Sequence, residues 1–464
     1  MKTYELQPTQ ENLIFTYEQD SIDRNVHLHY FIDILDSVED CCSVAIDGKW
    51  GTGKTFFVKQ AKMILDSFNN HTQFVSEEDR ARVCSTWEKY HSKDSERELM
   101  PQVCVYYDAW QFDNDDDPLL SLMYEILNSV AVDYSFNKSR DCVKILAGVV
   151  DAFSGRNLAG LIDTLKDKED PMEGIKNNRE VLSMVNEFLD IILSERGNRI
   201  VVFVDELDRC NPSYAVRLLE RIKHYFSKET VTFVFSVNTM ELQHTIRQYY
   251  GANFNASRYL DRFFDMRVSL PPANMQKYYS LVSFKPDSNM HNMIVQAVIN
   301  RYEFELREIS KYLRLVKIAT SKAMNEKTPL DFSHAEGRGR RFALLTITPI
   351  LIGLQLYDLS LYNSFVRGGN YKPLLDVLID SVFTDWLCSI LLDPNETIKE
   401  TGNPNEVVVD LNDKVIGFYN ALFNTAYDHS VYRKRIGDIT ITATTQVFIK
   451  NVVSLLSDCA DYSE

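Results

Sequence analysis

The stretch Gly48 to Thr55, GKWGTGKT, constrains the fold of this 464-residue chain more than any other feature. It matches G-x-x-x-x-G-K-[ST] at every fixed position, between an apolar run at 43–46 and a run with helical spacing at 55–68. Glycines let backbone N–H groups turn inward around phosphates, and the following helix presents its N-terminus to the anion. The stretch therefore predicts a strand, a phosphate-binding loop and a helix, in that order.

Four later apolar runs have the length and bounds of buried strands, at 102–107, 199–205, 231–238 and 263–272. Helical stretches separate these runs, which is the pattern of a parallel sheet covered by helices on both faces. The sequence therefore predicts an α/β fold with a central parallel sheet of five core strands.

The chain after residue 272 has no comparable strand run until 438–444, so it is predicted to be mainly helical with one short strand there. The pattern GRGRR at 337–341 predicts a flexible joint. We expect three parts: 1–272, with a helical insertion at about 114–196, then 273–336 and 337–464.

The formal net charge of -16 argues against a surface that binds nucleic acid as a whole. Two small basic clusters interrupt the acidic composition: Arg338, Arg340 and Arg341, and Arg433, Lys434 and Arg435. Each cluster fits either a solvated loop or a phosphate-binding patch. The composition thus disfavours nucleic acid as a partner without excluding it.

The composition bears on the compartment of the protein and on whether it crosses a membrane. None of the eight cysteines has a metal-binding spacing, and the first 20 residues do not resemble a signal peptide, so a cytoplasmic location is expected. Val143–Ile162 is interrupted by charges, and Phe342–Tyr357 contains Pro349. Both stretches fall short of the roughly 20 apolar residues of a membrane span, so we expect buried or amphipathic helices.

Four residues have the chemistry of phosphoryl transfer. Lys54 is expected to reach the β- and γ-phosphates, and Thr55 to place its hydroxyl on Mg²⁺. Asp205 ends the strongest apolar run and is the expected second partner of Mg²⁺. The adjacent Glu206 is predicted to polarise the attacking water.

Four residues close to strand ends have two readings each. Asn238 is a candidate for positioning water near the γ-phosphate, and the alternative is a turn-forming asparagine. Asp208 and Arg209 fit either a cap with a structural ion pair or part of the site. Trp110 follows the second strand and either packs an acidic loop against the phosphate-binding loop or belongs to the core; we favour structural packing.

Arginines are the candidates for a residue that reaches a nucleotide from outside its own loop. Arg258, Arg262 and Arg267 precede or lie in the fifth strand, and Arg262 is favoured as a finger that reaches the γ-phosphate of a neighbouring subunit. A surface salt bridge is the alternative for each. Arg307 is a candidate for sensing nucleotide from a helical lid.

Five motifs, in this order, resemble the KAP family of P-loop NTPases. They are IDGKWGTGKT (46–55), YDAWQFD (107–113), VVFVDELDRCNP (201–212), FSVNTMELQHTI (235–246) and SRYLDRFFDMRVSLP (257–271). LREISKYL (306–313) is similar to the helical lid of that family. The chain departs from the family in having Glu206 and Asn238 where Asp is common, and in carrying charges where members often have transmembrane hairpins.

The resemblance implies a P-loop fold of the additional-strand type. In this fold the first strand lies in the middle of the sheet, with the strand that ends at Asp205 and its neighbours on one side and the fifth strand on the other. A helical lid and a mainly helical C-terminal region follow the sheet domain. It implies ATP and Mg²⁺ as cofactors. The nucleotide contacts would come from Gly48, Lys49, Trp50, Gly51, Thr52, Gly53, Lys54, Thr55, Phe56 and Arg307.

Two function classes follow. The first is a Mg²⁺-dependent ATPase in which Lys54, Glu206, Asn238 and Arg262 act in catalysis and hydrolysis is coupled to conformational change or homo-oligomer assembly. Bacterial members resemble anti-phage or anti-plasmid defence components, which makes defence the expected setting. The second is a nucleotide-gated scaffold that recruits a protein effector with little hydrolysis of its own.

Overall fold

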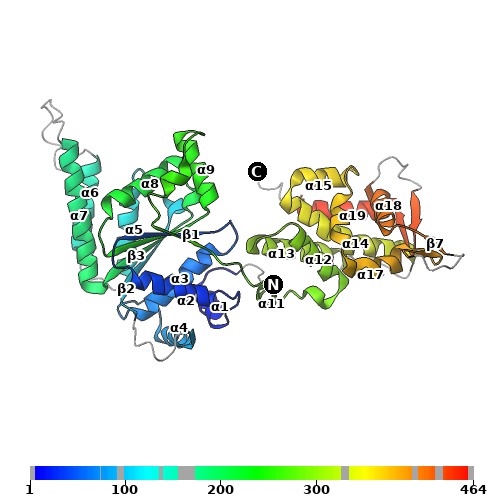
Figure 1. Cartoon of the computed structure of the whole chain (residues 1–464), viewed down its shortest axis with the longest axis horizontal. Helices are drawn as coiled ribbons and strands as arrows, with labels where there is room; N and C mark the ends of the chain where they lie inside the picture. Colours follow the sequence, from blue (N-terminus) through cyan, green and yellow to red (C-terminus); the bar gives the residue numbers. More distant parts are fainter. Residues whose placement is uncertain are drawn as a thin grey trace. The chain divides into compact units, whose positions relative to one another are not determined.

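A computed structural model describes residues 6–73, 75–90, 99–134, 139–154, 173–324, 334–399, 406–423 and 432–457. The chain divides into two compact units, Leu6–Tyr278 and a second that begins at Tyr279 (Figure 1). The expected division of the chain at 272 and 336 stays a prediction.

The first unit is built on a five-stranded parallel sheet. Its strands are β1 (Cys42–Asp47), β2 (Gln102–Asp108), β3 (Arg199–Asp205), β4 (Val231–Val237) and β5 (Met266–Ser269). Their order is β2-β3-β4-β1-β5, and every pairing is parallel. The predicted α/β fold is confirmed, and β1 lies between β4 and β5 as the family resemblance implied.

Helices cover both faces of the sheet because neighbouring strand residues point to opposite faces. In β3, Ile200, Val202 and Val204 join one buried cluster, and Val201 and Phe203 join the other. The second cluster lies under α1 (Gln10–Glu18), α2 (Asn25–Ser37), α3 (Lys54–Phe68) and α4 (Glu77–Tyr90). The first lies under α5 (Pro118–Asp133), α6 (Ser139–Ser154), α7 (Glu173–Arg196), α8 (Pro212–Tyr225), α9 (Thr239–Tyr250) and α10 (Ala256–Leu260) (Figure 1).

The second unit is mainly helical, as predicted. After α11 (Met275–Leu281) its helices are α12 (Met290–Arg301), α13 (Leu306–Met324), α14 (Ala335–Tyr357), α15 (Leu359–Val366), α16 (Lys372–Leu378), α17 (Ser381–Leu391), α18 (Leu411–Phe423) and α19 (Ala443–Ser457). Two short strand pairs accompany them, β6 (Glu396–Thr397) with β7 (Val407–Val408), and β8 (Arg433–Ile436) with β9 (Ile439–Thr442). β9 falls within the predicted strand at 438–444.

The prediction of a flexible joint at 337–341 is wrong, because these residues belong to the first turns of α14. A Cβ on Gly339 would lie 2.3 Å from the backbone oxygen of Thr440, so glycine is needed for a close approach to β9. Arg338 donates to the Asp438 carbonyl, and Arg340 pairs with Glu336. Gly339 and Arg338 therefore attach the β8–β9 hairpin to α14.

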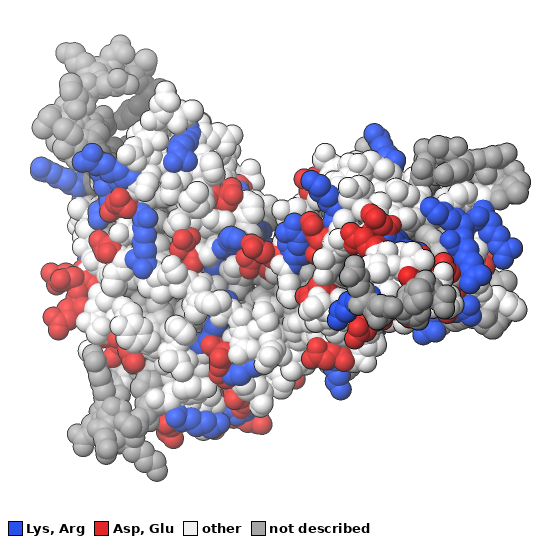
Figure 2. All heavy atoms as spheres, turned by 45° about the vertical axis from the view of Figure 1, so that its right-hand side comes forward, with Lys and Arg blue, Asp and Glu red and all other residues white. Residues whose placement is uncertain are grey.

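The second basic cluster lies on a strand. Arg433, Lys434 and Arg435 of β8 are exposed, and Figure 2 shows basic side chains gathered at the right-hand end of the second unit. Charged side chains on an outer strand discourage pairing with another chain. This structural role is sufficient for the cluster, and its use as a phosphate-binding patch stays a prediction.

The described parts of the two apolar stretches, 143–162 and 342–357, lie in helices. α14 continues through Pro349 and is buried over most of its second half. α6 covers 139–154, and the rest of the stretch to 162 lies outside the described residues. Within the part of the chain that the structure describes, no helix has the length and hydropathy of a membrane span.

Candidate nucleotide-binding site

The loop between β1 and α3 has the backbone of a phosphate cradle. Gly51 and Gly53 have φ of 85° and 95°, a left-handed conformation that favours glycine. The Gly48 N–H donates to Val237 of β4, which ties the start of the loop to the sheet. α3 then begins at Lys54 with Gly53 as its N-cap, so its unpaired N–H groups face the loop.

Side chains hold the loop in this shape. Thr52 Oγ1 donates to the Lys49 carbonyl at 2.8 Å, and Arg24 Nη1 donates to the Thr52 carbonyl at 2.9 Å. Lys54 Nζ donates to the carbonyls of Gly48 at 2.5 Å and Lys49 at 3.1 Å. The ammonium that would bind phosphate therefore already lies inside the loop.

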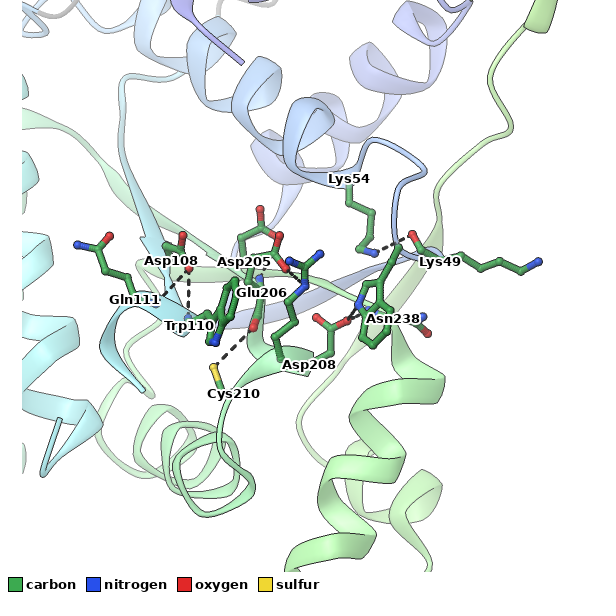
Figure 3. A network of polar contacts seen from close by, with 12 residues as sticks. Lys49, Lys54, Asp108, Trp110, Gln111, Asp205, Glu206, Asp208, Cys210 and Asn238 are labelled. Carbon is green, nitrogen blue, oxygen red and sulfur yellow. Dashed lines mark hydrogen bonds and ion pairs between the residues drawn. The ribbon is translucent and has the colours of Figure 1, made fainter. Parts of the chain in front are cut away.

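Acidic side chains meet Lys54 at the carboxyl ends of the strands. Burial lowers the pKa of Lys54, while Asp208, Asp205 and Glu206 act in the opposite direction. Figure 3 shows Lys54 of α3 and Asp205 and Glu206 at the end of β3 pointing into the same space. The fold thus brings the predicted phosphate-binding and acidic residues to one edge of the sheet.

Asp205 is held rigidly. It is 2% exposed, and its Oδ2 accepts a hydrogen bond from Tyr106 Oη at 2.9 Å. Its Oδ1 accepts from the Glu206 N–H at 3.0 Å. Tyr106 was not recognised from the sequence, because an aromatic residue inside an apolar strand run gives no sign of its polar partner.

Glu206 has a strained backbone. Its φ of 59° and ψ of 22° lie in the left-handed region, which costs a residue other than glycine about 1–3 kcal/mol. Its Oε2 forms an ion pair with Arg209 Nε at 2.6 Å. Burial and then Asp205 raise the pKa of Glu206, and Arg209 opposes them. The surrounding residues thus maintain a carboxylate of raised basicity in an unfavourable conformation.

Asp208 connects three parts of the site. Its Oδ2 accepts from Trp50 Nε1 of the phosphate-binding loop at 2.6 Å and from the Asn238 N–H after β4 at 3.2 Å (Figure 3). Burial raises the pKa of Asp208, and the bond from Trp50 lowers it. Asp208 therefore does more than cap a turn, since it joins the loop to the ends of β3 and β4.

Arg209 lies between two tryptophans. Its guanidinium carbon is 5.8 Å from the ring centre of Trp50 and 5.6 Å from that of Trp110. Trp110 is 53% exposed, which excludes the core reading. The sequence pattern missed this cluster, although Arg209 three residues after Glu206 is at the spacing of a local ion pair.

Other predicted site residues have defined places. Asn238 Oδ1 caps α9 by accepting from the Met240 and Glu241 N–H groups, so only its amide nitrogen is left for a water molecule. Phe56 packs against the core under α1 to α4. Arg307 is an exposed residue near the start of α13, in the second unit.

The candidate finger arginines lie around the start of β5. The Asp265 N–H donates to the Ser43 carbonyl near the start of β1, and Arg262 precedes Asp265 by three residues. Arg262 is exposed. Arg267 pairs with Asp261 at 2.5 Å, which is the salt-bridge alternative, and Arg258 is exposed on α10. The role of Arg262 as a finger toward a neighbouring subunit stays a prediction.

The oxygen atoms of Thr55 and Asp205 are the candidate protein ligands of Mg²⁺. This ion takes one or two protein oxygens together with phosphate oxygens and water. Thr55 is a half-buried residue in the first turn of α3, and Asp205 is the last residue of β3. No group of three His, Cys, Asp or Glu residues suited to a metal occurs among the described residues. The pair Thr55 and Asp205 fits Mg²⁺ that arrives with a nucleotide.

Comparisons with known proteins identify a family, a relative and a distant solved structure. A family model described as the KAP family P-loop domain matches residues 24–322. The uncharacterized protein MJ0182 of Methanocaldococcus jannaschii is 25% identical over 165 residues, which cover 27% of this chain and 84% of that protein. A solved structure of the Aeropyrum pernix ORC2 protein in ADPNP and ADP complexes has a TM-score of 0.31 and 11% identity, over 86% of this chain and 94% of that chain. That structural likeness is too distant to support an argument.

Proposed function

This chain belongs to the KAP family of P-loop NTPases, and we propose that it hydrolyses a nucleoside triphosphate, ATP by preference, with Mg²⁺. The observation that carries the proposal is the convergence of Lys54, Asp205 and Glu206 at the carboxyl edge of the sheet. A buried ammonium beside a phosphate cradle and two adjacent carboxylates supply the groups that phosphoryl transfer requires.

The residues have separate tasks in this proposal. The backbone of Gly48 to Thr55 binds the phosphates, and Lys54 turns from its own loop carbonyls to the β- and γ-phosphates. Thr55 and Asp205 hold Mg²⁺, which neutralises charge on the phosphates when it is bound. Tyr106 keeps the Asp205 carboxylate oriented toward the loop.

Glu206 is the proposed base for the attacking water. Only its Oε2 is engaged, by Arg209, and its other carboxylate oxygen has no protein partner in the described ranges. A raised pKa increases the affinity of that oxygen for a proton. The free oxygen can therefore accept a proton from water while the ion pair holds the group in place.

The test is phosphate release from ATP by the purified full chain. We expect turnover that requires Mg²⁺ and is abolished in Lys54→Ala, because Lys54 supplies the ammonium that lies inside the loop. Lys89→Ala removes an exposed lysine on α4 of the same unit and serves as the matched control. Equal turnover in Lys54→Ala and Lys89→Ala would refute the proposal. GTP measured in parallel decides the base preference.

A nucleotide-gated scaffold is the second candidate. One observation favours it: Lys54 is bound to its own loop and Glu206 is paired with Arg209, which suits slow intrinsic hydrolysis. Arg262, which is exposed, would then contact the nucleotide of a second copy. Light scattering after size exclusion, with and without a non-hydrolysable ATP analogue, tests assembly. An unchanged mass counts against the scaffold, and a larger mass lost in Arg262→Ala supports it.

The proposed biological setting is defence against phage or plasmids, with a protein effector as partner. This setting rests on the family resemblance alone. A nuclease, deaminase or toxin encoded beside the gene supports it. Protection of cells that is lost in Lys54→Ala tests it directly, and protection that persists in this variant contradicts the link to the nucleotide site.

A further inference from the structure

The proposed chemistry gives Arg209, a cation of the site, no task toward the nucleotide. It follows β3 in the short helix Leu207–Arg209, directly after Glu206. Its side chain is 24% exposed, so it is neither a buried structural group nor a freely solvated one. The guanidinium carries five N–H donors and stays charged at any ordinary pH.

The surroundings of Arg209 restrict where its guanidinium can go. Trp50, from the phosphate-binding loop, and Trp110, from the segment after β2, each lie within 6 Å of it. Trp50 is itself fixed by its hydrogen bond to Asp208. The arginine is therefore confined between the phosphate-binding loop and the end of β3 by contacts that do not use its N–H groups.

The ion pair with Glu206 uses one part of the guanidinium. Arg209 Nε contacts Glu206 Oε2 at 2.6 Å, and in the described part of the chain the two Nη groups have no hydrogen-bond partner. In a P-loop protein the terminal phosphate lies between the loop lysine and the acids at the adjacent strand ends. Arg209 contacts both of these regions, the phosphate-binding loop through Trp50 and the end of β3 through Glu206.

We propose that Arg209 binds the terminal phosphate of the chain's own nucleotide and thereby makes the site select triphosphate over diphosphate. This inference rests on the proposed function. A γ-phosphate offers more charge and more acceptor oxygens than one carboxylate oxygen, and the planar guanidinium suits it. Arg209 then divides its charge between Glu206 and the phosphate, which loosens the ion pair without displacing the Glu206 carboxylate, only when a triphosphate is present. A diphosphate leaves the ion pair intact.

The test compares the affinities of two ligands in the presence of Mg²⁺, a non-hydrolysable ATP analogue and ADP, by calorimetry on the full chain. Arg209→Ala is expected to weaken the analogue about 10- to 100-fold, the range for losing hydrogen bonds to a charged group. The affinity for ADP should change less than about threefold, since Arg209 does not reach the β-phosphate in this account.

The matched control is Arg221→Ala. Arg221 also combines an ion pair, 2.8 Å to Asp117, with an aromatic contact, 5.7 Å to the Tyr225 ring centre, but it lies on α8 outside the site. Both affinities should stay at their wild-type values in this variant. A thermal unfolding scan of each variant establishes that it is folded, and Arg209→Lys supplies a second, charge-retaining variant with an intermediate loss.

In Glu206→Gln, the affinity for the ATP analogue should change in a way that a purely structural role for Arg209 does not predict. Loss of the carboxylate charge weakens the attraction between residue 206 and Arg209, so the analogue should bind more tightly than in wild type, and Arg209→Ala in the same chain should remove that gain. If Arg209→Ala weakens both ligands equally or neither, the inference is wrong while the proposed function stands. If wild-type chain binds neither ligand, the proposed function itself fails.

Discussion

The substitution Glu206→Gln removes one carboxylate charge and can leave the surrounding structure of the site unchanged. Glutamine has the same shape, and its amide oxygen can still accept from Arg209 Nε, which is 2.6 Å from Glu206 Oε2. The backbone at φ 59° is fixed by the strand end and the following helix, not by the charge. We therefore expect the variant to fold and to bind nucleotide.

The magnitude follows from the role of the carboxylate. A positioned general base contributes typically 10²–10⁴-fold, so turnover should fall at least about 10²-fold, or about 2.7 kcal/mol in barrier height. The ion pair that is lost is local and partly exposed, and pairs of that kind contribute about 0.3–1 kcal/mol to stability. Function should thus change far more than stability.

The pH dependence provides an internal check. Burial and the neighbouring Asp205 raise the pKa of Glu206 above its ordinary 4.5, so turnover should fall on the acid side with a midpoint above that value. A raised carboxyl pKa gives stability that is present below 4.5 and is lost as pH rises through the folded value. The stability of wild type relative to Glu206→Gln should therefore decline as pH increases above 4.5.

Stopped-flow or steady-state phosphate release, measured beside calorimetric binding, is the assay. Wild-type turnover in the Glu206→Gln chain would remove the base assignment. Loss of nucleotide binding together with turnover would mean that the carboxylate supports the fold of the loop instead. An unchanged acid limb of the pH profile in the variant would show that a different group titrates.

Packing predictions test the rest of the fold. Gly339→Ala should destabilise the chain by about 1–3 kcal/mol, because its Cβ would lie 2.3 Å from Thr440 O, and Gly417→Ala in α18 should stabilise by about 0.5–1 kcal/mol, because nothing lies within 4 Å. Urea midpoints that shift in the same direction would contradict this contrast. Tyr134→Phe should cost about 1–3 kcal/mol, since its buried hydroxyl donates to Asp66 and accepts from the Cys104 N–H; thermal unfolding at the wild-type temperature would contradict it.

The sheet was predictable because its strands are buried on both faces. The run 199–205 coincides with β3, and the register of Asp108 with Asp205 follows once the strands are parallel. In a continuous apolar run, the residues on both faces of the strand are apolar, so the strand can be located without knowing which face is buried. The phosphate-binding loop was equally predictable, because its glycines are required by the backbone conformation of the loop itself, which depends on neighbouring residues in the sequence.

Helix faces and close contacts were harder to predict. Val26 and Tyr30 fit the apolar spacing of α2 but are 64% and 69% exposed, because its buried face is centred on residues such as Phe31 and Ile32. Gly339 suggested a joint, yet its partner Thr440 is about 100 residues away in the chain. Such contacts depend on tertiary packing, which local pattern does not encode.

The arrangement around Arg209 shows the same limit inside the site. Trp50, Trp110 and Arg209 come from three segments, and each has an ordinary local explanation. Only their convergence around Glu206 gives them a task. The favoured finger, Arg262, was selected by sequence position before a strand, whereas a cation beside the base could be found only from the folded structure.

The central claim is that Lys54, Thr55, Asp205 and Glu206 form one nucleotide site. Determination of the structure of the full chain with Mg²⁺ and a non-hydrolysable ATP analogue tests it most directly. The account predicts that Lys54 Nζ leaves Gly48 O, now at 2.5 Å, for a phosphate oxygen at about 3 Å, with Thr55 and Asp205 beside the metal. An analogue bound elsewhere, or Lys54 still bound to Gly48 beneath the phosphates, would contradict it.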